Sequence, residues 1–283
     1  MSDCINTKWI GSDGKYVKLF ENNLSRYVDR KYGIAVSSGT AALDIAFAAL
    51  GLSKKDEVIL PTFTIISCVA PLIRLGINPI FIDSYDDTWN MDISKIEAKI
   101  TVKTKAIMAV HIFGLSVDMD PLIKIANQYN LLIIEDAAQA IGLNYKGKPC
   151  GSFGDISTFS TFYSHHISTI EGGIITTDDD ELNALARSIR AHGWTRDLPD
   201  TIELCERRDD DFYEAYRFIL PGYNVRPQEI NAAIGLEQLK KLPSMTEVRR
   251  KNWLTFNHFF KDDDRFIIQR ENGKSSCFSF TMI

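Results

Sequence analysis

The protein has 283 residues, of which 45% are hydrophobic and 24% are charged, and its formal net charge is −5. These values are ordinary for a soluble globular protein of one or two domains. Lys and Arg are spread along the chain without a basic cluster, which argues against a protein that binds nucleic acids or anionic membranes.

The five cysteines are scattered and form no C-x-x-C pair. This pattern predicts neither a zinc site nor a disulfide framework, and it suits a reducing compartment. No apolar run approaches the length of a membrane span, and the N-terminus lacks the apolar core of a signal peptide. We therefore expect a cytoplasmic protein that has no membrane segment and no metal site.

Short apolar runs alternate with amphipathic stretches in the first half of the chain. We expect strands at 33–38, 57–61, 79–84, 105–113 and 131–137, and helices at 40–50, 66–75, 93–100 and 120–129. Strands that are apolar along their whole length and separated by helices indicate an α/β fold with a mostly parallel sheet, covered on both faces.

The second half begins with two more expected strands, 154–162 and 172–177, which are joined by a short connection. Long helical patterns follow at 181–192, 226–242 and 245–261, and two strand-like runs at 265–269 and 276–283 end the chain. Ligands of open α/β sheets bind beyond the carboxyl ends of the strands, so functional residues are expected there.

One such place is SSGTAA (37–42), between a strand and a helix. The N–H groups of Gly39, Thr40 and Ala41 would point outward from the start of the helix, a geometry that suits a phosphate. Ser-Gly-Thr is also a good helix cap, so this segment alone does not establish a phosphate site.

Glu135 and Asp136 follow the most apolar strand, in EDAAQA (135–140). Burying two carboxylates without partners is costly, and adjacent strand residues face opposite ways, so only one of the two can point into a given site. An aspartate at this position could hold a protonated pyridine nitrogen, and a carboxylate that caps the following turn is the alternative.

The segment 157–177 concentrates polar residues between two strands, among them Ser160 and the adjacent pair His165 and His166. The chain has only five histidines. A metal site is the first alternative, but no second cluster of ligands at a suitable spacing supports it. A buried structural histidine is the other alternative, more easily for His166 than for both.

Two further segments place polar residues near helix ends. RAHGWTR (190–196) offers His192, Trp194 and Arg196 on a turn, and GYNVRPQE (222–229) places Asn224 and Arg226 before a helix start that suits anions. Each is also explained as an ordinary capped loop.

Taken together, these segments resemble the DegT/DnrJ/EryC1/StrS family of pyridoxal-phosphate sugar aminotransferases. SSGTAALDIAFAALGL, EVILPTFT, IIEDAAQA, TIEGG and GYNVRPQE occur in the order of that family, and the likeness covers nearly the whole chain. The family carries its Schiff-base lysine eight residues before the last glycine of E-G-G, where this chain has His165. That substitution resembles the 3-dehydratase branch of the family.

The resemblance implies an aspartate-aminotransferase-like fold of type I, with a seven-stranded, mostly parallel sheet. It implies a large cofactor-binding domain at 1–243 and, at 244–283, the start of a small C-terminal domain that is incomplete here. The cofactor would be pyridoxal 5′-phosphate or pyridoxamine 5′-phosphate, and the protein would be a homodimer with shared active sites.

The resemblance also implies the residue roles. Those for the cofactor are Gly39, Thr40 and Ser160 at the phosphate, Asp136 at the ring nitrogen, Gln139 at the ring or its hydroxyl, and Asn224 reaching the phosphate of the neighbouring subunit. His192, Trp194 and Arg196 would contact the substrate. The position of the family's ring-stacking aromatic residue is Ile65 here, so either the stacking is aliphatic or Phe63 substitutes.

His165 would be the catalytic base, because an imidazole cannot form a stable Schiff base but moves protons readily near neutral pH. The implied reaction removes the C3 hydroxyl of a nucleotide-linked 4-keto-6-deoxy sugar, preferably GDP-linked, for lipopolysaccharide O-antigen. L-glutamate would regenerate the pyridoxamine form. A 4-aminotransferase of the perosamine-synthase type and a non-catalytic protein of the same fold remain the alternatives.

Overall fold

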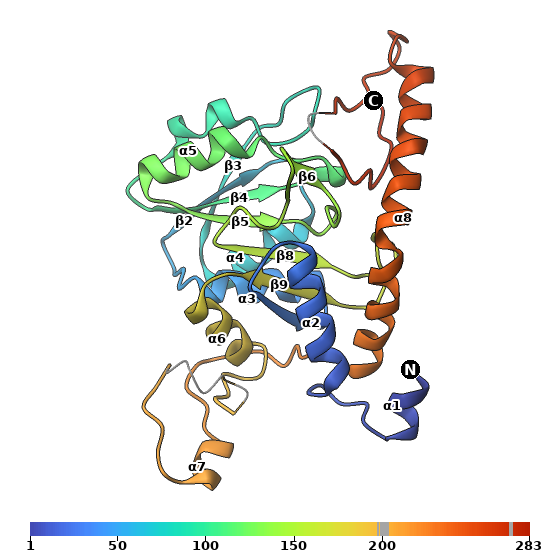
Figure 1. Cartoon of the computed structure of the whole chain (residues 1–283). Helices are drawn as coiled ribbons and strands as arrows, with labels where there is room; N and C mark the ends of the chain where they lie inside the picture. The colour runs from blue at the N-terminus through green and yellow to red at the C-terminus, as the bar shows by residue number, and fades with distance from the viewer. Residues whose placement is uncertain (197, 199–203, 272–273) are drawn as a thin grey trace.

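A computed structural model describes residues 1–196, 198, 204–271 and 274–283 of the chain (Figure 1). Its centre is a seven-stranded sheet, in which the strand order is β1-β9-β8-β5-β4-β2-β3. The strands are β1 Tyr32–Val36, β2 Glu57–Pro61, β3 Asn78–Ile82, β4 Thr104–Val110, β5 Leu132–Asp136, β8 Ile156–Ser160 and β9 Gly173–Thr177. Only β9 runs antiparallel to its neighbours β1 and β8, and the remaining pairs are parallel. The predicted mostly parallel sheet is confirmed.

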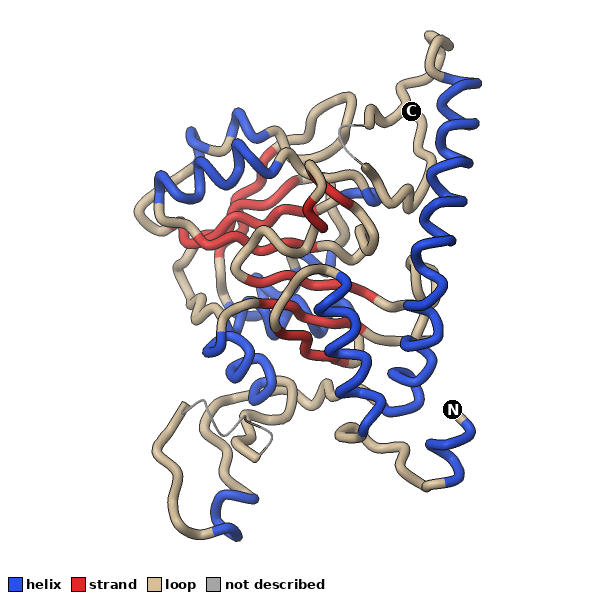
Figure 2. The backbone as a smooth tube through the Cα atoms, viewed as in Figure 1, coloured by secondary structure: helices blue, strands red, loops and turns tan. Residues whose placement is uncertain are grey.

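In every strand of the sheet except β3, successive residues enter two separate hydrophobic cores, as the alternation of side chains along a strand requires. Ile59 of β2 belongs to one core, with α2, α5 and α8, whereas Val58 and Leu60 belong to the other, with α3, α4 and α6. All strands except the partly exposed edge strand β3 are therefore buried on both faces, and Figure 2 shows the strands gathered into one sheet between helices. This burial explains the apolar runs in β2, β4 and β5.

The α-helices are α1 Ser2–Asn6, α2 Lys15–Tyr27, α3 Gly39–Ala49, α4 Ala70–Leu75, α5 Met119–Tyr129, α6 Asp180–Ile189, α7 Asp211–Ala215 and α8 Glu229–Phe260. Four 3₁₀ turns, η1 Ile66–Cys68, η2 Ile93–Lys95, η3 Glu97–Lys99 and η4 Ile112–Gly114, complete the helical elements of the described residues. Ser38 caps α3 by accepting the N–H of Ala41, and Asp179 caps α6 by accepting the N–H of Leu182. These side chains satisfy backbone donors that the first turn of a helix leaves free.

The structure corrects the predicted elements in three places. The helix expected at 93–100 is two short 3₁₀ turns, η2 and η3. The two helices expected at 226–242 and 245–261 are the single helix α8, which continues through Pro243. Proline removes one helix hydrogen bond, but Leu242 and Thr246 are buried on either side of it and stabilise both halves. The long helix runs along one side of the molecule (Figure 1).

The third correction concerns the end of the chain. Residues 265–269 and 276–283 form no strand in the described part of the chain, and they pair only at the bridge between Ile268 and Met282. Residues 274–278 are held elsewhere: Ser276 N–H donates to the carbonyl of Gly114 at 3.0 Å, and Phe278 N–H donates to the carbonyl of Phe113 at 3.0 Å. This segment therefore lies against the end of β4.

Several elements were not predicted, among them α1, α2, β6 and β7. α2 packs against α8, and a small hairpin is formed by β6 Asn144–Tyr145 and β7 Lys148–Pro149. The predicted boundary at 243/244 falls inside α8, so the division into two domains stays a prediction. Among the described residues, none of the helices combines the length and the apolar composition that a membrane span needs.

Candidate active site

A cavity of about 480 Å³ opens at the carboxyl ends of β5 and β8. This volume is within the usual range for pockets that bind small molecules or cofactors. Seven of the predicted site residues line it: Gly39, Thr40, Ile65, Asp136, Gln139, Ser160 and His165. The topology brings them together from the start of α3, the segment after β2, and the ends of β5 and β8, as expected for an open α/β sheet.

The start of α3 and the end of β8 form a cradle on one side of this cavity. Gly39 lies so close to β8 that a Cβ atom on it would come within 2.8 Å of the Cβ of Ser160. The hydroxyl of Thr40 lies 2.9 Å from the hydroxyl of Ser67, which also lines the cavity. Two hydroxyls and a helix N-terminus face the same space, a combination that suits a phosphate group.

The adjacent carboxylates of β5 have different environments. Asp136 lines the cavity, and its Oδ1 accepts the N–H of Ala138 at 2.9 Å. Glu135 is fully buried and accepts the N–H groups of Gly151, Phe153 and Gly154, each at 2.7 Å. The prediction that only one of the pair can face the site is confirmed for this cavity.

Glu135 belongs to the structural interior. Burial alone would raise the pKa of its carboxyl, but the hydrogen bonds from His111 and from the backbone of Gly154 and Gly151 lower that pKa to about 2. The Nε2 of His111 is 3.0 Å from Glu135 Oε2, and His111 Nδ1 accepts the N–H of Val117 at 3.2 Å. Through these hydrogen bonds, the carboxylate of Glu135 connects the end of β4 and the loop before β8 to β5.

His165 and His166 also have different environments. His165 lines the cavity, and its Nδ1 is 3.4 Å from the hydroxyl of Ser160. Burial lowers the pKa of its imidazole, and the nearby negative charge of Asp136 opposes this shift. The lowered pKa leaves the ring neutral and able to accept a proton near neutral pH.

His166 lies outside the cavity and is buried, with its Nε2 3.1 Å from the carbonyl of Ser276. Burial lowers its pKa to about 4, so this ring is neutral as well. Its Nδ1 has no hydrogen-bond partner among the described residues. Of the two histidines, His166 is the structural one, and the three-ligand clusters that a metal site needs are not found in the described chain.

The cavity contains residues that the sequence analysis missed. Phe278 comes from the C-terminal segment and packs on His165, with 5.4 Å between ring centroids and 31° between the ring planes. Thr158 lies opposite Asp136 in the β5–β8 register and also lines the cavity. The register of two predicted strands could have identified Thr158, but no local pattern in the sequence indicates Phe278.

The cavity also distinguishes Ile65 from Phe63. Ile65 lines it, whereas Phe63 is not among its lining residues and packs edge-on against Phe113, with 5.9 Å between ring centroids. Gln139 is held by the N–H of Phe113, which donates to its Oε1 at 2.8 Å. The amide nitrogen of Gln139 is thereby the group that can donate into the cavity.

His192, Trp194, Arg196 and Asn224 do not line this cavity. Trp194 stacks on Phe218 with ring centroids 5.4 Å apart, and the guanidinium of Arg196 lies 3.7 Å from the centroid of the Trp194 ring. These four residues thus lie outside the cavity of their own chain, and their roles at the cofactor and the substrate stay predictions.

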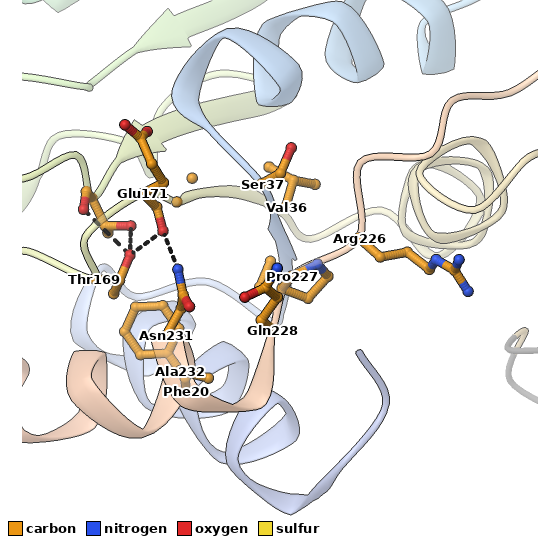
Figure 3. Close-up of a pocket in the computed structure, with 14 residues that line it drawn as sticks. Phe20, Val36, Ser37, Thr169, Glu171, Arg226, Pro227, Gln228, Asn231 and Ala232 are labelled. Atoms are coloured by element: carbon orange, nitrogen blue, oxygen red, sulfur yellow. Dashed lines mark hydrogen bonds between the residues drawn. The ribbon is translucent and has the colours of Figure 1, made fainter. Parts of the chain in front are cut away.

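A second, smaller pocket of about 140 Å³ lies between the end of β1 and the start of α8 (Figure 3). Glu171 lines both pockets, and its backbone carbonyl accepts hydrogen bonds from Thr169 at 2.9 Å and from Asn231 at 2.8 Å. The side chain of Arg226 points away from the other labelled side chains (Figure 3), and its guanidinium lies 3.3 Å from Asn224 Oδ1. Asn224 and Arg226 thus form a separate polar group outside the larger cavity.

The whole chain, residues 1–283, matches the DegT/DnrJ/EryC1/StrS aminotransferase family. The chain belongs to this family. The fold that the family implies is confirmed by solved structures. The GDP-4-keto-6-deoxy-D-mannose-3-dehydratase of E. coli with bound hydrated PLP has a TM-score of 0.96 and 40% identity, covering 100% of this chain and 74% of that one. A histidine-to-asparagine mutant of GDP-4-keto-6-deoxymannose-3-dehydratase with bound GDP-perosamine also has a TM-score of 0.96 at 40% identity, covering 100% and 75%.

Two curated members of the family are also similar to this chain over most of its length. GDP-4-keto-6-deoxy-D-mannose 3-dehydratase of Yersinia pseudotuberculosis is 44% identical over 277 residues, which is 95% of this chain and 70% of that protein. GDP-perosamine synthase of Caulobacter vibrioides is 41% identical over 249 residues, which is 88% of this chain and 63% of that protein. The chain is therefore similar both to GDP-4-keto-6-deoxy-D-mannose 3-dehydratases and to GDP-perosamine synthases.

Proposed function

We propose that this protein is a pyridoxal-phosphate-type dehydratase that removes the C3 hydroxyl of a GDP-linked 4-keto-6-deoxy sugar. The observation that carries the proposal is the position of His165, which lines the cavity together with Asp136 where aminotransferases of the family use a lysine. A histidine cannot form the Schiff base on which a lysine-dependent aminotransferase relies, but it can move protons. The likeness to the 3-dehydratases at 44% identity supports the same reaction.

The residues present fit the cofactor. Gly39 and Ser160 lie close together at the start of α3. The hydroxyls of Thr40 and Ser160 and the N–H groups of the helix start would donate hydrogen bonds to the phosphate. Asp136 would hold the protonated ring nitrogen, and Ile65 would provide an aliphatic surface for the ring. The amide of Gln139 would contact the ring hydroxyl. When bound, pyridoxamine phosphate supplies an amine for the 4-keto group and a ring that accepts electrons.

The chain's own contribution to the chemistry is proton transfer at His165. Ser160 lies beside Nδ1, so Nε2 is the ring nitrogen left to accept and return a proton. The neutral imidazole, which burial favours, is the form that acts as a base. Phe278 covers one side of the ring and limits the access of water to it.

We further propose that the active enzyme is a cytoplasmic homodimer, with L-glutamate as the second substrate and O-antigen sugars as the products. Asn224 lies outside the cavity of its own chain, which supports a role at the phosphate of the neighbouring subunit. His192, Trp194 and Arg196 also lie outside the cavity of their own chain, which supports a role as contacts for the substrate of the neighbouring subunit. The free thiols of all five cysteines suit a reducing compartment.

The test is to incubate the purified protein with pyridoxamine phosphate, L-glutamate and GDP-4-keto-6-deoxymannose, and to follow ammonia release and product mass. Ammonia together with a product that has lost one oxygen supports the proposal, and His165→Asn should abolish both while the cofactor still binds. A 4-amino sugar formed without ammonia would contradict it and favour the aminotransferase. Tight cofactor binding without turnover of this sugar would contradict the proposed substrate and favour a non-catalytic protein.

A further inference from the structure

The buried thiol of Cys68 contacts the carboxylate that faces the cavity. Cys68 is the last residue of η1 and is 0% exposed, and its Sγ lies 3.0 Å from Asp136 Oδ2. The hydroxyl of Thr64 donates to the same sulfur at 3.1 Å. On the other side, Ala138 N–H donates to Asp136 Oδ1 at 2.9 Å. Both oxygens of Asp136 therefore have a donor from the protein.

The direction of the hydrogen bond from Cys68 follows from its surroundings. Burial, together with the negative charge of Asp136, raises the pKa of the Cys68 thiol well above its ordinary value. The sulfur therefore keeps its proton at neutral pH and donates it to the carboxylate. Cys68 is not among the residues that line the cavity, so it reaches any bound molecule only through Asp136.

We propose that Cys68 is a positioning residue, which orients the Asp136 carboxylate toward the ring nitrogen of the bound cofactor. The thiol and the N–H of Ala138 each occupy one lone pair of the two oxygens, and the remaining lone pairs are free to accept the N–H of a protonated ring. The inference rests on the proposed function, in which Asp136 holds that nitrogen. Without the thiol, the carboxylate can rotate, and its hydrogen bond to the ring becomes longer and weaker.

The experiment uses pyridoxamine 5′-phosphate labelled with ¹⁵N at the ring nitrogen. The ¹⁵N chemical shift of the bound cofactor reports the protonation of the ring, and fluorescence titration reports the affinity. Cys68→Ala should move the shift toward that of the unprotonated ring and weaken binding about tenfold, as expected for a lost hydrogen bond to a charged group. Cys68→Ser, which keeps a donor, should restore most of both. Cys150→Ala removes a buried thiol that does not line the cavity, and it should change neither.

Asp136→Asn separates the two hypotheses. If Asp136→Asn moves the ¹⁵N shift and Cys68→Ala leaves the shift and the affinity as in the unmodified protein, the role of Cys68 is refuted and that of Asp136 stands. If Asp136→Asn also leaves the shift unchanged, the cofactor does not bind as proposed, and both hypotheses fail. An equal loss of affinity in Cys68→Ala and Cys150→Ala, without a change in shift, would mean that the thiol only fills space.

Discussion

Glu135 and Asp136 are adjacent on β5, yet one carboxylate is enclosed by backbone N–H groups and the other lines the cavity. Alternation along the strand places them on opposite faces of the sheet. The first joins the loop before β8 to the sheet, and the second is available to a ligand. A single strand thus provides both a structural and a functional carboxylate.

Replacing Glu135 should destabilise the fold. Glu135→Gln would put an amide group among the donors of Gly151, Phe153 and Gly154, which have no other acceptor of equal strength there. We expect a loss of about 1.5–3 kcal/mol in the free energy of unfolding, the usual worth of buried hydrogen bonds to a charged group. Urea denaturation of the cofactor-free protein measures it. Asp136→Asn is the matched control and should cost clearly less; equal losses would contradict the assignment of Glu135 as the structural carboxylate.

His166 should make the stability depend on pH. Its folded-state pKa of about 4 lies below the ordinary value of 6.5, so its neutral form contributes fully above pH 6.5, and this contribution is lost as the pH falls toward 4. The shift corresponds to roughly 3 kcal/mol. In His166→Gln, whose amide can still donate to Ser276, the free energy of unfolding should fall less over this range. Parallel pH curves for the two proteins would refute the prediction.

His165 should set the acidic limb of the rate profile. Because burial lowers its pKa below 6.5, kcat/KM should fall only at a pH lower than that of an ordinary histidine. Phe278→Ala exposes the imidazole and should move the limb upward, toward pH 6.5. The pH dependence of kcat/KM for both proteins provides the check, and a limb that stays in place in Phe278→Ala would show that this packing does not control the pKa.

Gly39 should be essential for cofactor binding. In Gly39→Ala the added methyl group would lie 2.8 Å from the Cβ of Ser160, so the start of α3 must move away from β8. We expect the affinity for pyridoxamine phosphate to fall at least about tenfold, in line with the cost of overpacking. Gly11→Ala is the control, because no atom lies within 4 Å of its added Cβ. Equal affinities in the two variants, measured by fluorescence titration, would argue against a phosphate at this cradle.

The sequence by itself determined the strands of the sheet and seven of the residues that line the cavity. The strands are recognisable because burial on both faces requires apolar residues throughout, and the cavity residues because ligands bind where parallel strands end. The histidine in place of lysine is likewise visible in one short segment, 165–173. These features depend on local patterns and on a topology that such patterns imply.

Tertiary structure alone decided which neighbours these residues have. Phe278 reaches His165 across more than a hundred residues of chain, and the thiol of Cys68 reaches Asp136 from a different element. Pro243 also lies inside a continuous helix, with the buried residues Leu242 and Thr246 on either side of it. Contacts of this kind depend on how separate elements pack and on the exact register between them, and no pattern within a short segment encodes them.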